Sequence, residues 1–370
     1  MRGRYEKTKE IHKWKKAVLA IAIILGVIFI AAIISGVILY NSMLGKLDQV
    51  DVPDIIYTSP EEETIPTTEA SQTIPTQLTE PTATTVEPHV KSSADYINFL
   101  VVGQAAREGE TERFADSMIL CTVNTYEKTL TMTSLLRDSF VKMPDYKGRT
   151  GGRIKLTTIY HLGSMYGDGI AGSMELMNLT LYNNFGIEVD HNFEIDFDAF
   201  IRVIDMLGGI DIELSEAEAN YLNDDDFWVY YDVEPGTAHL DGMAALCYVR
   251  MRKAEGDGES DIVRTGRQRK FVEALLTQLR GKSISELNEI ANTVLPLITT
   301  SMDNSEITEC LLLLLPMLPD LKIEKSGTCP ANHHGDMIDI YSDGMYHSVL
   351  RFDVNETKKT MRAITEGETP

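Results

Sequence analysis

The sequence predicts an α/β domain in which a mixed central β-sheet is flanked by helices on both faces, in α-β-α layers. Residues 96–103 and 117–124 are apolar runs of strand length, and residues 129–135 alternate as a half-buried strand does. The short junction at 126–128 predicts a hairpin, which makes the sheet mixed. Helical patterns then alternate with further strand patterns, an order that is typical of a layered α/β domain.

The elements that follow the hairpin are predicted from spacing and from the glycines that end them. We expect helices over 154–167 and 171–186, a strand over 191–196, a helix over 197–209 and a strand over 210–214. Helices are then expected over 241–252, 264–280, 284–297 and 304–315, and a short strand with a closing helix within 346–364.

The N-terminal region predicts a membrane anchor. Residues 17–40 carry no charge, and about 20 apolar residues suffice to cross a bilayer. Residues 1–16 hold seven Lys or Arg and two Glu, which favours a cytoplasmic N-terminus and an extracytoplasmic domain. A buried core helix and a cleaved signal peptide are the alternatives. The apolar run is too long for a usual signal peptide, and no small-residue cleavage site follows it.

Residues 41–94 are predicted to be a disordered linker. The stretch 59–93 is rich in Thr, Pro and Glu and nearly free of aromatic residues, so it cannot repay the entropy cost of folding. We interpret it as a tether that holds the domain off the membrane, with a glycosylated stalk as the alternative. The predicted folded part comprises an α/β domain over 95–280 and a helical extension over 281–370, packed on the same domain.

Composition excludes one broad class of function. The chain has 43% hydrophobic and 24% charged residues and a net charge of −22, so it lacks the broad basic footprint that nucleic-acid binding needs. Cys121 and Cys247 lie in apolar patterns and are expected in the core, whereas Cys310 and Cys329 could pair outside the cytoplasm. His333 and His334 are either a base or metal pair or part of an exposed turn.

Basic residues gather between residues 247 and 276 of this acidic chain. Arg250 and Arg252 end one helical pattern, and Arg264, Arg267 and Gln268 share one face of the next. Pairing with the acidic loop between these helices is the simpler interpretation, since surface ion pairs are common and weak. Several guanidinium groups that converge would instead bind a diphosphate, because each binds phosphate oxygens bidentately and stays charged.

A second basic point follows a predicted strand. Arg137 comes directly after the strand 129–135, and ligand sites of α/β folds gather at strand ends. Asp116 opens the neighbouring strand and could hold a magnesium ion against phosphate oxygens, or simply begin the strand. The sequence contains no GxSxG, P-loop, HExxH or dinucleotide fingerprint.

Taken together, these motifs resemble the LytR–CpsA–Psr (LCP) family of bacterial cell-wall proteins. The matching segments occur in family order over about residues 95–279: NFLVVGQAAR, ADSMILCTVN, TMTSLLRDSF, GRIKLTTIYHLGS, DMLGGIDIEL, HLDGMAALCYVRMRK and SDIVRTGRQRKFVEAL. The resemblance implies an extracytoplasmic phosphotransferase that moves an anionic glycopolymer, such as teichoic acid or capsule, from a polyprenyl diphosphate carrier to peptidoglycan.

The resemblance also implies roles for individual residues. Asp116 matches one of two family aspartates that hold Mg²⁺ (or Mn²⁺), and Arg137, Arg250 and Arg252 match residues of the catalytic site. The residues that would bind the diphosphate are Arg107, Arg137, Arg250, Arg252, Arg264, Arg267 and Gln268. The polyprenyl tail would lie in an apolar slot between the sheet and the helices. Asp116 or Asp138 would accept the proton of the attacking hydroxyl.

Two positions depart from the family pattern. Ala105 stands where the first aspartate belongs, and Phe114 replaces an arginine, although Arg113 lies beside it. Losing one carboxylate weakens a magnesium site, and Glu108, Glu110 or Glu112 are the nearby candidates to replace it. The alternatives to a transferase are therefore a polyprenyl-phosphate-binding protein without catalysis and a polyprenyl pyrophosphate hydrolase.

Overall fold

The computed structural model places most of the chain after residue 94. It describes residues 48–53, 55, 95–104, 113–224, 231–252, 261–280, 282, 286, 297–314, 317, 319–331, 333–342 and 345–367. The predicted anchor 17–40, most of the predicted linker and nearly all of the predicted helix 284–297 lie outside these residues. Within the described ranges, no helix combines the length and the apolar character that crossing a bilayer needs.

A seven-stranded mixed sheet forms the centre of the fold. Its strands are ordered β1-β10-β7-β2-β3-β4-β11. They span Asp48–Gln49 (β1), Thr299–Thr300 (β10), His191–Ile195 (β7), Tyr96–Gln104 (β2), Ala115–Asn124 (β3), Thr129–Leu135 (β4) and Lys322–Cys329 (β11). Strands β2, β3 and β4 pair antiparallel, with the predicted hairpin between β3 and β4. Strand β7 pairs parallel with β2 and antiparallel with β10, and β11 pairs parallel with β4. The prediction of a mixed sheet is confirmed.

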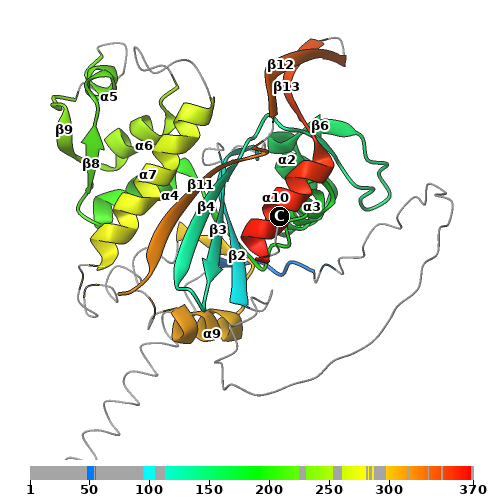
Figure 1. The fold of residues 1–370 in the computed structure, drawn as a ribbon, viewed down its shortest axis with the longest axis horizontal. Coiled ribbons are helices and arrows are strands. Elements are labelled where there is room, and N and C mark those ends of the chain that lie inside the picture. The colour runs from blue at the N-terminus through cyan, green and yellow to red at the C-terminus, as the bar shows by residue number, and fades with distance from the viewer. Residues whose placement is uncertain are drawn as a thin grey trace, which may run out of the picture.

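Helices cover both faces of this sheet (Figure 1). The helices α2 (Leu156–Tyr166), α3 (Gly169–Phe185) and α10 (Val354–Thr365) lie on one face, and α7 (Asp261–Arg280) and α9 (Asn304–Leu314) lie on the other. The strands follow a period of two: Leu100 and Val102 of β2 point to the first face and Phe99 to the second. The predicted α-β-α layers are therefore present.

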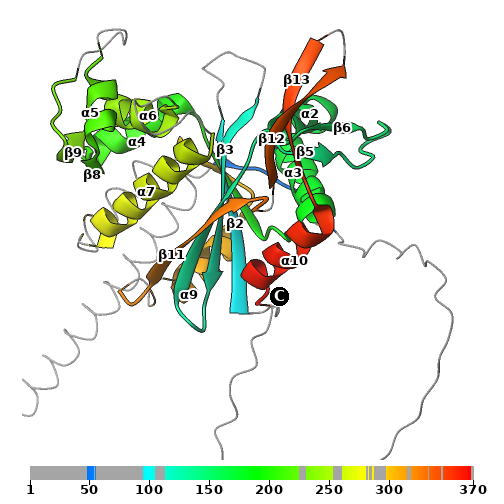
Figure 2. The same ribbon diagram turned by 45° about the horizontal axis from the view of Figure 1, so that its top comes forward.

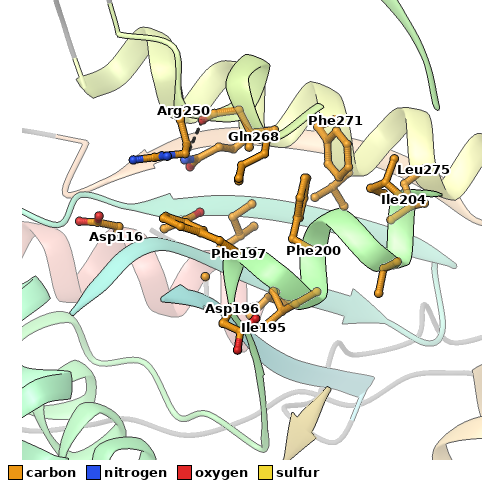
Figure 3. Close-up of a pocket in the computed structure, with 18 of the residues that line it drawn as sticks. Asp116, Ile195, Asp196, Phe197, Phe200, Ile204, Arg250, Gln268, Phe271 and Leu275 are labelled. Carbon is orange, nitrogen blue, oxygen red and sulfur yellow. Dashed lines mark hydrogen bonds between the residues drawn. The ribbon is translucent and has the colours of Figure 1, made fainter. Parts of the chain in front are cut away.

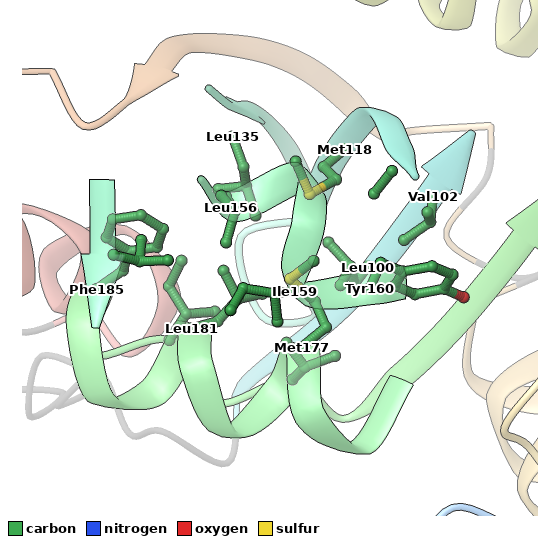
Figure 4. Close-up of a cluster of buried hydrophobic side chains, with 14 of the residues drawn as sticks. Leu100, Val102, Met118, Leu135, Leu156, Ile159, Tyr160, Met177, Leu181 and Phe185 are labelled. Atoms are coloured by element: carbon green, nitrogen blue, oxygen red, sulfur yellow. The ribbon is translucent and has the colours of Figure 1, made fainter. Parts of the chain in front are cut away.

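The first face is closed by the larger of two cores that contact the sheet. Side chains of the sheet, such as Leu100 and Met118, meet Ile159 and Tyr160 of α2 and Leu181 of α3, all of them fully buried (Figure 4). Helices α2 and α3 approach so closely at Gly163 that a β-carbon there would collide with the backbone of α3. Burial at this density makes the first face a rigid support for the opposite one.

A smaller layer of helices and strands lies beside α7. It contains α4 (Phe197–Met206), β8 (Ile210–Leu214), α5 (Glu216–Leu222), β9 (Gly236–Leu240) and α6 (Gly242–Arg250), with an apolar core of its own. Helix α6 begins against α4, where a β-carbon on Gly242 would collide with the backbone of Ile201. This close approach fixes the N-terminal end of α6 against α4.

Two small hairpins complete the described fold. Strands β5 (Phe140–Lys142) and β6 (Arg153–Lys155) form one of them. Strands β12 (His333–Ser342) and β13 (Met345–Phe352) form the other, which projects from the domain (Figure 2). His333 and His334 therefore belong to a strand and not to a turn.

The structure corrects two predicted boundaries. Residues 281–370 are not a helical extension, because β10 and β11 from this segment join the central sheet and β12 and β13 form a hairpin. Residues 41–94 are not disordered throughout, because β1 pairs with β10 and the Val50 amide donates to the Thr300 carbonyl at 2.8 Å. The four cysteines are all free, so Cys310 and Cys329 do not form a disulfide.

Candidate functional site

A cavity of about 840 Å³ lies between the second face of the sheet and the helices α4, α6 and α7. One end is polar, and its lining residues include Asp116, Glu194, Arg250, Arg252, Arg264 and Gln268. The rest is a long apolar slot lined by residues such as Phe197, Phe200, Ile204, Phe271, Leu275 and Ile298. Figure 3 shows this division, with Arg250 and Asp116 at one end and Ile204 and Leu275 at the other.

The polar end is built where α6 ends and α7 begins. The guanidinium of Arg250 lies over the ring of Phe197, 4.5 Å from its centroid, which holds an exposed cation at the mouth of an apolar slot. Gln268 donates to the carbonyl of Val249 at 3.3 Å and so ties the two helices together. Arg264 is buried and donates to the backbone carbonyl of Asp116 at 3.2 Å, which connects α7 with β3.

A row of alternating charges continues from the polar end, along the edge of the sheet where β3 begins and β4 ends. Arg137 Nη1 lies 2.7 Å from Asp116 Oδ1, and Arg137 Nε lies 3.6 Å from Asp138 Oδ2. Lys155 Nζ lies 2.7 Å from Asp138 Oδ1. Arg137 follows the C-terminal end of β4, as its position after the strand predicts, and it reaches the cavity through Asp116.

Glu194 is a lining residue that the sequence analysis missed. Its two carboxylate oxygens are held separately: Arg113 Nη1 lies 2.7 Å from Oε1, and the Tyr160 hydroxyl donates to Oε2 at 2.6 Å. Burial raises the pKa of Glu194, against the opposing effect of these two partners. The period-two pattern of β7 could place Glu194 on a face, but its partners come from segments far away in sequence.

Two of the clustered arginines serve the structure rather than the cavity. Arg267, predicted to bind the diphosphate, is buried with its Nε 2.7 Å from Glu218 Oε1 and its Nη1 3.2 Å from the Met251 carbonyl. Arg269 donates to the Ser134 hydroxyl at 2.6 Å, and burial lowers the pKa of its guanidinium. The structure therefore does not bring Arg267 to the cavity with Arg250, Arg252, Arg264 and Gln268.

The described residues do not form a magnesium site by themselves. Asp116 is the family position for a metal ligand, but its carboxylate is engaged by Arg137, and no group of three His, Cys, Asp or Glu side chains suited to a metal occurs within the described ranges. Ala105, Arg107 and the candidate replacements Glu108, Glu110 and Glu112 lie outside the described residues.

The mixed sheet and the apolar cavity with an arginine-lined end define the class of protein as an α/β domain of the LytR–CpsA–Psr type. The LytR_cpsA_psr family profile matches residues 63–362, which is most of the chain. The protein belongs to this family, and the resemblance found in the sequence is confirmed.

Named relatives agree with this assignment. The chain is 31% identical over 217 residues to biofilm regulatory protein A of Streptococcus mutans, covering 56% of this chain and 49% of that protein. It is 31% identical over 219 residues to the polyisoprenyl-teichoic acid–peptidoglycan teichoic acid transferase TagV of Bacillus subtilis, covering 59% and 51%. The chain thus spans about half the length of these two relatives.

Solved structures share the fold. The structure of TagT bound to LI-WTA superposes with a TM-score of 0.54 at 25% identity, over 76% of this chain and 95% of TagT. A protein of Streptococcus agalactiae superposes with a TM-score of 0.55 at 27% identity, over 72% of this chain and 88% of that protein. These likenesses support the central mixed sheet with flanking helices.

Proposed function

We propose that this protein is an extracytoplasmic phosphotransferase that moves an anionic glycopolymer, of teichoic acid or capsule type, from a polyprenyl diphosphate carrier to peptidoglycan. The observation that carries the proposal is the cavity itself, because its apolar slot suits a prenyl chain and its arginine-lined end suits a diphosphate. The names of the transferase relatives support the same substrate class. Residues 17–40 would anchor the enzyme, with residues 1–16 in the cytoplasm.

The reaction exchanges the phosphoanhydride bond of the carrier diphosphate for a phosphoester bond to peptidoglycan. A peptidoglycan hydroxyl attacks the phosphorus that bears the glycan, the bond from that phosphorus to the bridging oxygen breaks, and polyprenyl phosphate leaves. Arg250, Arg252 and Arg264 would stabilise the charge that develops on the leaving phosphate, with Arg137 acting from beside Asp116. The hydroxyl proton passes to a carboxylate at the polar end, where Asp116 lines the cavity and Asp138 lies one residue from Arg137.

The test compares two arginines of the same layer. Arg250→Ala removes a cation from the cavity mouth, whereas Arg202→Ala removes an exposed cation of α4 that does not line the cavity. Turnover of a polyprenyl-diphosphate-linked glycopolymer, with peptidoglycan as acceptor, should fall by about 100-fold or more in the first variant and stay unchanged in the second. Equal turnover in both variants would refute the assigned role.

A second candidate function is capture of polyprenyl phosphates without transfer. The observation that favours it is the lack of a metal-ligand set in the described residues, together with Ala105 at a family aspartate position. Ala105→Asp separates the two functions. An inert wild-type protein whose Ala105→Asp variant gains magnesium-dependent turnover supports capture, and a wild-type protein that transfers glycopolymer excludes it. Release of free polyprenyl phosphate without an acceptor would instead indicate a hydrolase.

A further inference from the structure

The first described strand lies at an unexpected place in the chain. Only seven residues, 41–47, separate the apolar segment 17–40 from β1. Strand β1 is docked on the sheet by its pairing with β10 and by a side-chain hydrogen bond of 2.7 Å from Gln49 Nε2 to Asn304 Oδ1. Val50 and Val52, just beyond β1, pack against the main core.

This docking changes which part of the chain sets the distance between the domain and the membrane. Seven extended residues reach about 25 Å at most. The Thr-, Pro- and Glu-rich stretch 59–93 begins after β1 and ends before β2, so both of its ends are attached to the same domain. Its length therefore does not set the height of the domain above a bilayer.

One apolar surface lies next to the docked strand. Helix α9 starts at Asn304, the partner of Gln49, and carries two exposed leucines near its other end: Leu312 is 72% and Leu313 is 46% exposed. The first turns of α9 are acidic, with Glu306 and Glu309 exposed, so the leucines form an isolated apolar tip. Leu312 follows Asn304 by eight helical positions, a rise of about 12 Å.

We propose that the C-terminal turn of α9, with Leu312 and Leu313, rests on the outer surface of the lipid bilayer in the anchored protein. The inference depends on the anchoring by residues 17–40 that is part of the proposed function. Apolar side chains on a helix insert into the boundary between headgroups and acyl chains, and the short connection to β1 keeps them within reach of it. Figure 1 places α9 at the end of the sheet near the start of β2, and Ile298, immediately before β10, lines the apolar slot.

The experiment measures the depth of α9 in the full chain. The protein is inserted into nanodiscs of phosphatidylcholine, and a bimane fluorophore is attached at Leu312→Cys in a background without the four native cysteines. Quenching by lipids brominated near the headgroup should lower the emission about twofold, as expected for a side chain at the interface. The control is bimane at Met165→Cys on α2, which is 58% exposed and should remain unquenched.

A further variant tests which part of the chain sets the position of α9. Deleting half of residues 59–93 should leave the quenching at position 312 unchanged. Equal emission at positions 312 and 165 overturns the proposal, and so does a change in quenching when the segment 59–93 is shortened.

The outcomes separate this proposal from the function itself. A chain that does not insert into nanodiscs contradicts both the anchor and the bilayer contact. A chain that inserts without quenching at position 312 contradicts only the contact. Glycopolymer transfer is measured in detergent with the same preparation, and its absence contradicts the enzyme while leaving the quenching result valid.

Discussion

Arg137 and Asp116 form an ion pair at the edge of the cavity, with 2.7 Å between Nη1 and Oδ1. The carboxylate is one third exposed and the guanidinium half as much, so water screens the pair only in part. Any diphosphate that enters the polar end must therefore compete with Asp116 for Arg137. The contact holds the guanidinium beside a carboxylate that lines the cavity.

Replacing Asp116 by Asn should strengthen anion binding and weaken catalysis. Removing the carboxylate frees Arg137 and removes a negative charge, so the affinity for inorganic pyrophosphate should rise about two- to fivefold, the magnitude of a partly exposed pair. Titration calorimetry measures this affinity, and glycopolymer turnover should fall in the same variant. A weaker affinity would show that Asp116 assists binding, for example by holding a metal ion.

The buried pair of Arg267 and Glu218 should matter for stability. Glu218→Gln leaves the buried guanidinium without its counter-charge, which should lower the free energy of unfolding by about 3–5 kcal/mol. Glu216→Gln, on the exposed side of the same helix, should change it by less than about 0.5 kcal/mol. Urea unfolding at neutral pH compares the variants, and a similar midpoint for both would contradict a structural role for the pair.

The same pair should make the wild-type protein sensitive to acid. Burial works to raise the pKa of Glu218, but the Ser215 amide and Arg267 outweigh it, so the pKa is lower than that of a free glutamate. The stabilisation is complete above the ordinary value of about 4.3, and it is lost as the pH falls from there through the folded-state pKa. The wild-type protein should lose more stability between neutral pH and pH 3 than Glu218→Gln does. Parallel losses would exclude this linkage.

The apolar slot should be tested by changing the length of the prenyl chain. Phe200→Ser removes an aromatic wall of the slot, and KM for a long-chain diphosphate lipid should rise roughly tenfold or more, since burying such a side chain stabilises by about 1.5–3 kcal/mol. A short-chain analogue should bind equally well to variant and wild type. Met206→Ser on the same helix is the control, because Met206 is exposed and does not line the slot. An equal effect on short and long chains would argue against a prenyl site.

Replacing either of two glycines in the arginine-bearing helices α6 and α7 by alanine should change the stability of the protein, in opposite directions. Gly242→Ala forces a β-carbon against the Ile201 backbone and should destabilise the protein by about 1–3 kcal/mol. Gly266→Ala meets open space within α7 and should stabilise it by about 0.5–1 kcal/mol. Thermal unfolding measures both changes, and turnover should fall only in the first variant, because α6 carries Arg250. Stabilisation by Gly242→Ala would show that α4 and α6 are free to separate.

Local patterns in the sequence were sufficient to predict the central strands of the fold. Strands β2, β3 and β4 have long apolar or alternating runs, and the structure places them where those runs predict. Strands β1 and β10 have two residues each, too few to show any period. Strand β11 is polar and is interrupted by an irregularity at Gly327, so it resembles a loop in sequence although it pairs along its whole length with β4.

Only part of the candidate site could be predicted, because only part of it lies on one helix face. Arg264 and Gln268 lie four residues apart and share the face of α7 that continues to Phe271 and Leu275 in the slot. Arg267 lies at the flank of this face, and only the position of α5 decides that it meets Glu218. Spacing along one helix cannot show which neighbouring element covers its flank. The partners of Glu194 could not be predicted either, because they come from segments far away in the sequence.

The last described helix, α10, covers a central strand from the beginning of the folded region. Helix α10 packs against α3 and contacts β2, where Asn98 Nδ2 donates to the Thr365 carbonyl at 3.5 Å, and β11 supplies the outer strand beside β4. A ribosome makes the chain from its N-terminus, so the hydrophobic interior stays open until about residue 365 has been added. Truncation anywhere before α10 should therefore leave this interior uncovered and yield an aggregation-prone fragment.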